Sequence, residues 1–320
     1  MPEYFQLPAR RLLNRCNGKC LPFQRTINPY RGCELGCVYC YARYTHEFLD
    51  LDGIRDFETK IFAKQFFAGA LRAELAKADR QEAIAIGTPT DPYQPAERRF
   101  SVTRQILTVF AGEQGRRLSI TTKSDLVLRD LDLFGKIARA NFLHINITIT
   151  TLNARLARRL EPRAPRPDLR LGVVRELARA GLEVGVFPNP ILPLLTDSEE
   201  SLDALGAATA HAGASFMGDG LLFLRPPADQ VVFAFFEQHF PHLLPKYRQQ
   251  FRGPSRLGGE YPKLIQERVR KIRARYGLAG APAGHPPELW PGEPQGELFP
   301  PPTLHNPQST ISPTCAVIQR

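Results

Sequence analysis

The 320-residue chain is 43% hydrophobic and 23% charged, which suits one large globular domain or one domain with extensions. No apolar run is long enough to span a bilayer and the first residues lack the layout of a signal peptide, so we predict a cytoplasmic protein and exclude a membrane-spanning one. The formal net charge of +10 favours DNA or another polyanion as a partner, although scattered arginines also serve as solubilising surface.

Residues 1–24 read as a basic N-terminal extension with little periodicity. It carries Cys16 and Cys20, which could bind a second metal, but an isolated pair of cysteines at this spacing is more often incidental. With six cysteines and no export signal, the chain is expected to keep its thiols reduced and to use them for metal binding.

Three further cysteines, Cys33, Cys37 and Cys40, form a C-x3-C-x2-C array within residues 28–49. Soft thiolates select iron-sulfur clusters, and three of them leave one iron with an open position. Two alternatives stay open: a zinc site completed by Cys16, Cys20 or His46, or three thiols that merely pack.

After this array the chain alternates between helical and extended patterns. A first long helix is predicted over 59–78. Strands are then predicted at 82–91, 117–125, 143–151, 183–193 and 220–227, with helices between them at 103–115, 126–140, in two stretches of 153–181, and at 198–213, the last capped by Ser198. Such alternation predicts a parallel sheet with right-handed crossovers, either a complete or partial barrel or a doubly wound sheet. Residues 229–278 should form a C-terminal helical extension, and the Pro-rich residues 279–320 a disordered tail.

The residues that follow strands should gather at one end of a parallel sheet, so polar groups there are candidates for a site. They are Thr88, Thr90 and Asp91 after the strand at 82–91, Lys123 after the next, Thr148 and Thr150 after the third, and Arg163 or Arg170 in the segment that follows. Tyr39 and Tyr41 supply aromatic surface beside the cysteines.

The segment NPYRGCELGCVYCYARYTHE resembles the signature of the radical S-adenosylmethionine (radical SAM) enzymes, in the branch related to spore photoproduct lyase, and the resemblance extends over about residues 25–275. It implies an α/β fold with a partial (βα)6 barrel over 25–228. It also implies an enzyme whose 4Fe-4S cluster and S-adenosyl-L-methionine yield a 5′-deoxyadenosyl radical that abstracts hydrogen from a substrate, here DNA or another anion. Reduced flavodoxin or ferredoxin is the electron donor that the resemblance implies.

The resemblance assigns the cluster to Cys33, Cys37 and Cys40. For S-adenosylmethionine it implies contacts from Tyr39, Thr88, Thr90, Asp91, Lys123, Thr148, Thr150 and Arg163. One departure is notable, because Thr88 stands where the DNA-repairing lyase has a hydrogen-donating cysteine. Two rival functions are a non-catalytic zinc or nucleic-acid-binding module and an electron-transfer iron-sulfur protein; the missing fourth cysteine argues against the second.

Overall fold

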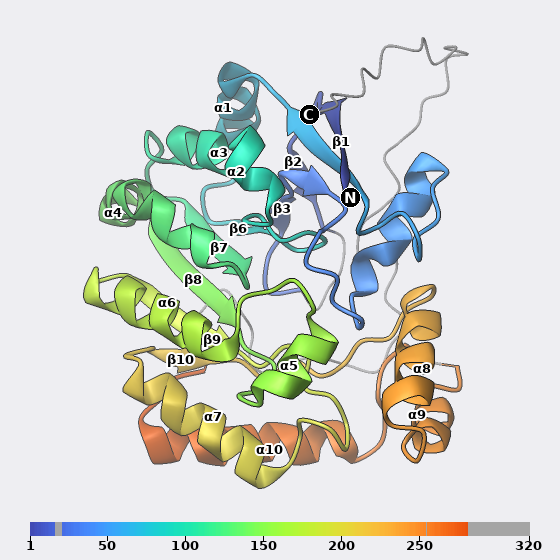
Figure 1. Ribbon diagram of the computed structural model, residues 1–320. Coiled ribbons are helices and arrows are strands. Elements are labelled where there is room, and N and C mark those ends of the chain that lie inside the picture. Colours follow the sequence, from blue (N-terminus) through green and yellow to red (C-terminus); the bar gives the residue numbers. More distant parts are fainter. Residues whose placement is uncertain (17–20, 254, 281–320) are drawn as a thin grey trace.

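The computed structural model describes residues 1–16, 21–253 and 255–280, and two sheets organise them (Figure 1). The larger sheet has the strand order β10-β9-β8-β7-β6-β3-β2. Its strands are β2 (Leu13–Arg15), β3 (Arg25–Ile27), β6 (Ala83–Ile86), β7 (Arg117–Thr122), β8 (Phe142–Thr148), β9 (Glu183–Phe187) and β10 (Phe216–Met217). All neighbours pair in parallel except β2 and β3, so the predicted α/β architecture with a mostly parallel sheet is confirmed.

The central strands β6, β7 and β8 place apolar side chains toward the helices and polar or small ones mainly on the opposite face, whereas β9 and β10 place Phe187 and Phe216 on that opposite face. On β8, Leu143, Ile145 and Ile147 join the main hydrophobic core, whereas the alternating His144, Asn146 and Thr148 are buried on the other face. Helices α1 (Ala68–Lys77), α3 (Val102–Phe110), α4 (Leu131–Ala140), α6 (Pro167–Arg179) and α7 (Glu199–His211) supply the core that meets the apolar face. The polar face of the strands therefore stays available for chemistry.

Short helices and a C-terminal group complete the chain. The short ones are α2 (Ala96–Phe100), α5 (Ala154–Leu160), η1 (Tyr41–Leu49) and η2 (Asp125–Asp130). The C-terminal ones are α8 (Ala228–His239), α9 (Leu244–Gln250) and α10 (Tyr261–Tyr276), and α10 packs along α7 (Figure 1). Ser198 caps α7 as predicted, its hydroxyl accepting from the Ser201 N–H at 3.1 Å. The predicted Pro-rich tail lies outside the described residues apart from 279–280.

The smaller sheet corrects one expectation about the first third of the chain. It has the order β1-β5-β4, with β1 (Glu3–Pro8), β5 (Lys60–Gln65) and β4 (Tyr30–Arg31). The helix predicted over 59–78 is therefore wrong in its first part, because Ile61 and Ala63 are buried while Lys60, Phe62 and Lys64 are not, which is the period of a strand. Strands β1 and β2 of the predicted N-terminal extension belong to the smaller and the larger sheet, respectively.

The last predicted strand, 220–227, is also wrong. Beyond β10, Leu221 and Phe223 make only single bridges, to Ile191 and Arg256. Leu222 and Leu224 instead enter a second hydrophobic core, which explains the apolar run without a strand. No helix in the described part of the chain is long and apolar enough to cross a membrane.

Candidate active site

The cysteine array forms a tight loop between β4 and η1. Cys33 and Cys37 are buried and Cys40 is half-buried. Gly32 has φ 80°, and a Cβ there would lie 2.8 Å from the Lys60 carbonyl oxygen, so only glycine fits this wrap. The Cys33 N–H donates to the Phe57 carbonyl at 3.0 Å and the Cys40 N–H to the Cys37 carbonyl at 3.1 Å, which fixes the backbone around the thiols.

A second hydrophobic core encloses this loop. Cys33, Cys37 and Tyr39 pack in it with side chains from the C-terminal helices α8 and α9, among them Phe236 and Tyr247. The two aromatic rings lie 3.8 Å apart between centroids. The C-terminal helical segment thus contributes to the apolar core in which the cysteine loop is packed.

Burial controls the state of the thiols. It raises the pKa of Cys37 to about 12 and that of Cys33 well above its ordinary value, where Asp91, Cys37 and Cys40 add negative charge. Without a metal the thiols are therefore protonated at neutral pH. A bound metal centre would displace these protons, because the thiolate is the ligand.

The donor set fits a three-thiolate cluster better than one zinc ion. Among the described residues no three His, Cys, Asp or Glu side chains converge on a single ion position. A cubane cluster needs no such convergence, because each thiolate binds a different iron. Two of the candidate fourth zinc ligands are engaged elsewhere: His46 Nε2 lies 3.0 Å from the Lys60 carbonyl oxygen, and Cys16 Sγ lies 3.8 Å from Thr26 Oγ1. The other candidate, Cys20, lies outside the described residues.

A buried polar network surrounds Tyr39, which stands between two of the cysteines. Its hydroxyl donates to Glu161 and lies 3.1 Å from Thr150 Oγ1, which itself donates to Glu161 at 2.9 Å. The other oxygen of Glu161 pairs with Arg170 at 2.5 Å, and both side chains are about 99% buried. Burial alone would raise the pKa of Glu161, but Arg170 and Lys123 outweigh it and lower the pKa. The network locks the tyrosine ring in place.

Lys123 joins this network from the end of β7. Its Nζ lies 5.7 Å from the centroid of the Tyr39 ring. Its backbone N–H donates to Asp91 at 2.8 Å, and Asp91 also accepts from Thr122 Oγ1 at 2.6 Å. The Asp91 carboxylate is thus held by the next strand, while the Lys123 ammonium lies beside the cysteine loop.

The predicted threonines divide into two groups. The first group lies within the Tyr39 network. Thr150 joins it through its hydroxyl, which donates to Glu161, and Thr148 joins it through its backbone carbonyl, which accepts from Arg170 at 3.0 Å. Thr90 Oγ1 donates to the Gly32 carbonyl at 2.7 Å and braces the loop, and the N–H and hydroxyl of Thr88 donate to Asn28 Oδ1 at 3.1 and 3.2 Å.

Of the two candidate arginines, Arg170 lies in the buried network. Arg163 is exposed, and its Nη1 donates to the Glu34 carbonyl at 2.9 Å on the outer side of the loop. Glu161 was not predicted as a site residue. Its only sequence signal was its place two residues before the candidate Arg163, because the pairing with Arg170 depends on how α5 and α6 pack.

The buried cysteine loop and the polar residues at the strand ends lie together at one edge of a parallel sheet. Comparison with known proteins agrees with the predicted family. The family model described as Radical SAM superfamily matches residues 27–205, and this chain belongs to that superfamily. The protein is therefore a radical SAM enzyme. Its relatives include the uncharacterized protein Rv2578c of Mycobacterium tuberculosis, 37% identical over 287 residues that cover 89% of this chain and 84% of that protein. The uncharacterized protein MJ0683 of Methanocaldococcus jannaschii is 32% identical over 173 residues, 54% of this chain and 62% of that protein.

Solved structures share the fold at low sequence identity. A mutant of spore photoproduct lyase with bound AdoMet and dinucleoside spore photoproduct has a TM-score of 0.65 at 17% identity, covering 88% of this chain and 80% of that one. Streptococcus suis SuiB bound to the precursor peptide SuiA has a TM-score of 0.51 at 13% identity, covering 80% and 47%. The fold predicted from the cysteine signature is thereby confirmed as that of a radical SAM protein.

Proposed function

We propose that Cys33, Cys37 and Cys40 bind a 4Fe-4S cluster whose open iron takes S-adenosylmethionine. The observation that carries the proposal is the buried C-x3-C-x2-C loop, enclosed by α8 and α9 and joined through Tyr39 to a fixed polar network. When bound, the cluster and S-adenosylmethionine supply reductive cleavage to methionine and a 5′-deoxyadenosyl radical that abstracts hydrogen from the substrate.

The chain's own residues orient the cofactor and exclude water. Lys123 offers a compact cation for the methionine carboxylate, and its position beside Tyr39 supports that role. Thr148 and Thr150 offer groups for the ribose, Thr88, Thr90 and Asp91 form the neighbouring strand-end segment, and Arg163 braces the cysteine loop from outside. The second hydrophobic core keeps the loop dry, which protects a radical from quenching by solvent.

DNA or another polyanion is the substrate class that we propose, with reduced flavodoxin or ferredoxin as electron donor. The net charge of +10 supports it, and spore photoproduct lyase, which shares the fold, has been solved with a dinucleoside photoproduct. A reducing, cytoplasmic setting suits such a centre.

Anaerobic reconstitution with iron and sulfide tests the ligand set. The wild-type protein should gain a brown chromophore with iron and sulfide bound, and Cys37→Ala should lose it. Cys16→Ala is the matched control, because Cys16 contacts Thr26 and lies outside the loop, so this variant should reconstitute normally. A colourless, zinc-loaded wild-type protein would instead support the zinc-binding alternative.

A further inference from the structure

The short helix α5 and the loop after it form a strongly basic surface, which we call the α5 surface. Between residues 153 and 170 the exposed side chains include five arginines and a single carboxylate, Asp168. The arginines are Arg155, Arg158, Arg159, Arg163 and Arg166. Asp168 pairs with Arg166 at 2.6 Å, and within the described part of the chain none of the other four forms an ion pair. Such a surface attracts an acidic partner.

The α5 surface lies directly on the cysteine loop. The Val38 N–H donates to the Leu160 carbonyl at 3.0 Å, and the Arg163 N–H donates to the Leu35 carbonyl at 3.2 Å. Leu160 and Ala164 pack in the same core as Cys33 and Cys37. One short helix with its following turn therefore separates solvent from the cysteines on this side.

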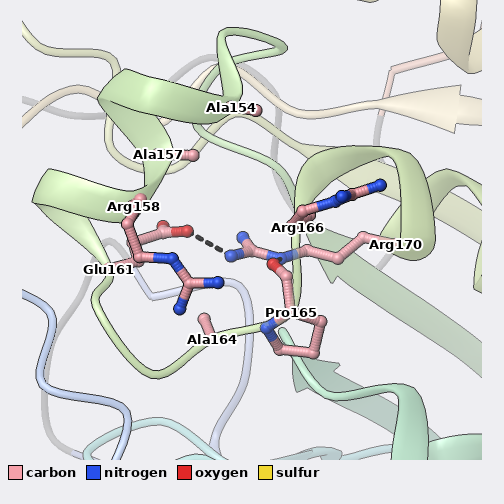
Figure 2. Close-up of a pocket in the computed structure, with 8 residues that line it drawn as sticks. All are labelled: Ala154, Ala157, Arg158, Glu161, Ala164, Pro165, Arg166 and Arg170. Atoms are coloured by element: carbon pink, nitrogen blue, oxygen red, sulfur yellow. Dashed lines mark hydrogen bonds and ion pairs between the residues drawn. The ribbon is translucent and has the colours of Figure 1, made fainter.

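A small pocket, with room for about one water molecule, lies beside α5 and the loop after it (Figure 2). Ala154, Ala157, Arg158 and Arg166 are among its lining residues. The Glu161–Arg170 pair also lines it, and Glu161 accepts from the Tyr39 hydroxyl beside the cysteines. The lining of this small pocket is therefore linked through Glu161 to Tyr39 in the cysteine loop.

We propose that the α5 surface docks the acidic one-electron donor protein that reduces the cluster. This inference rests on the proposed function, since it requires a cluster in the loop. In the step itself, the donor's reduced cofactor loses one electron and the cluster gains it, with no bond made or broken. Electron transfer falls steeply with distance, so the thin cover over the cysteines favours a donor protein here over nucleic acid.

The test measures how tightly reduced flavodoxin, an acidic protein, binds the double variant Arg155→Glu/Arg159→Glu. These two arginines are chosen because both are exposed and neither takes part in an ion pair among the described residues. The matched control is Arg72→Glu/Arg139→Glu, which reverses two exposed arginines on α1 and α4, helices that pack on the outer face of the sheet. We expect the first variant to raise the Kd for flavodoxin about tenfold and the control to change it less than about twofold. Wild-type binding should weaken as salt rises.

Cleavage of S-adenosylmethionine separates docking from chemistry. With dithionite as reductant, both double variants should form 5′-deoxyadenosine at the wild-type rate, whereas with flavodoxin only the α5 variant should slow. Unchanged flavodoxin affinity in the Arg155→Glu/Arg159→Glu variant would overturn the proposal. An equal loss of the cleavage rate with dithionite and with flavodoxin would also overturn it, as would a variant that loses DNA binding but keeps flavodoxin binding. If wild type makes no product with dithionite, the proposed function fails, and the flavodoxin titration still decides the docking surface.

Discussion

The buried pair of Glu161 and Arg170 makes a quantitative prediction about stability. Replacing Glu161 by Ala leaves the Arg170 charge buried without its counter-ion, a change that costs about 3–5 kcal/mol in the free energy of unfolding. Arg170 keeps two carbonyl acceptors, Pro165 at 2.7 Å and Thr148 at 3.0 Å, so we expect about 3 kcal/mol, the lower end of that range. Removing both charges, as in Glu161→Met/Arg170→Met, should recover most of the loss.

Urea unfolding of the iron-free protein under anaerobic conditions measures this. Glu176→Ala is the matched control, because it breaks an exposed pair with Arg179 and should cost less than about 0.5 kcal/mol. A loss below about 1 kcal/mol for Glu161→Ala would refute the reasoning that the variant leaves the Arg170 charge buried without its counter-ion.

The pH dependence of the same pair has a definite sign. The folded-state pKa of Glu161 is lowered, so the native state holds fewer protons there than the unfolded chain. The stabilisation is complete above about pH 4.3, the usual value for Glu, and is lost as the pH falls through the folded-state pKa. The difference in stability between wild type and Glu161→Gln should therefore shrink on acidification below about pH 4.

Other substitutions and assays test separate parts of the account. Gly32→Ala should abolish iron binding on reconstitution, because the added Cβ would lie 2.8 Å from the Lys60 carbonyl oxygen. The control Gly172→Ala, which has open space around it in α6, should bind iron normally and gain about 0.5–1 kcal/mol in the free energy of unfolding. Desolvation of the half-buried Lys64 and then Arg31 lower the pKa of this lysine to about 8, so between that value and about 10.4 only the unfolded chain keeps the proton and stability rises with pH. Lys64→Met should thus stabilise the protein by about 1 kcal/mol at pH 7 and progressively less toward pH 10, as chemical denaturation at the two pH values would show. DNA retardation should occur at low salt and weaken steeply as salt rises, and salt-insensitive or absent retardation would contradict a DNA substrate.

The sequence predicted features that depend on local spacing. The C-x3-C-x2-C array and the Ser198 cap are each set by residues a few positions apart, and most of the β/α alternation follows from periodicity within single elements. Strand β5 was missed because KIFAKQ precedes a helix-forming stretch and reads as its first turns; its pairing with β1, fifty-odd residues away, decides its conformation.

The remainder of the site depends on contacts between distant elements. Glu161 meets Tyr39 only because α5 packs on the cysteine loop, 122 residues away along the chain. Similarly, the run at 220–224 reads as a strand until Leu222 and Leu224 are seen in the second core. Periodicity identifies which face of a segment is buried but not which neighbour buries it.

The most direct measurement of the central claim is the formation of 5′-deoxyadenosine from S-adenosylmethionine. The wild-type protein and the variants Cys37→Ala and Cys16→Ala would be reconstituted anaerobically, reduced with dithionite and assayed together. The account predicts product from wild type and Cys16→Ala and none from Cys37→Ala. Equal product from all three, or none from a wild-type protein with iron and sulfide bound, would contradict it.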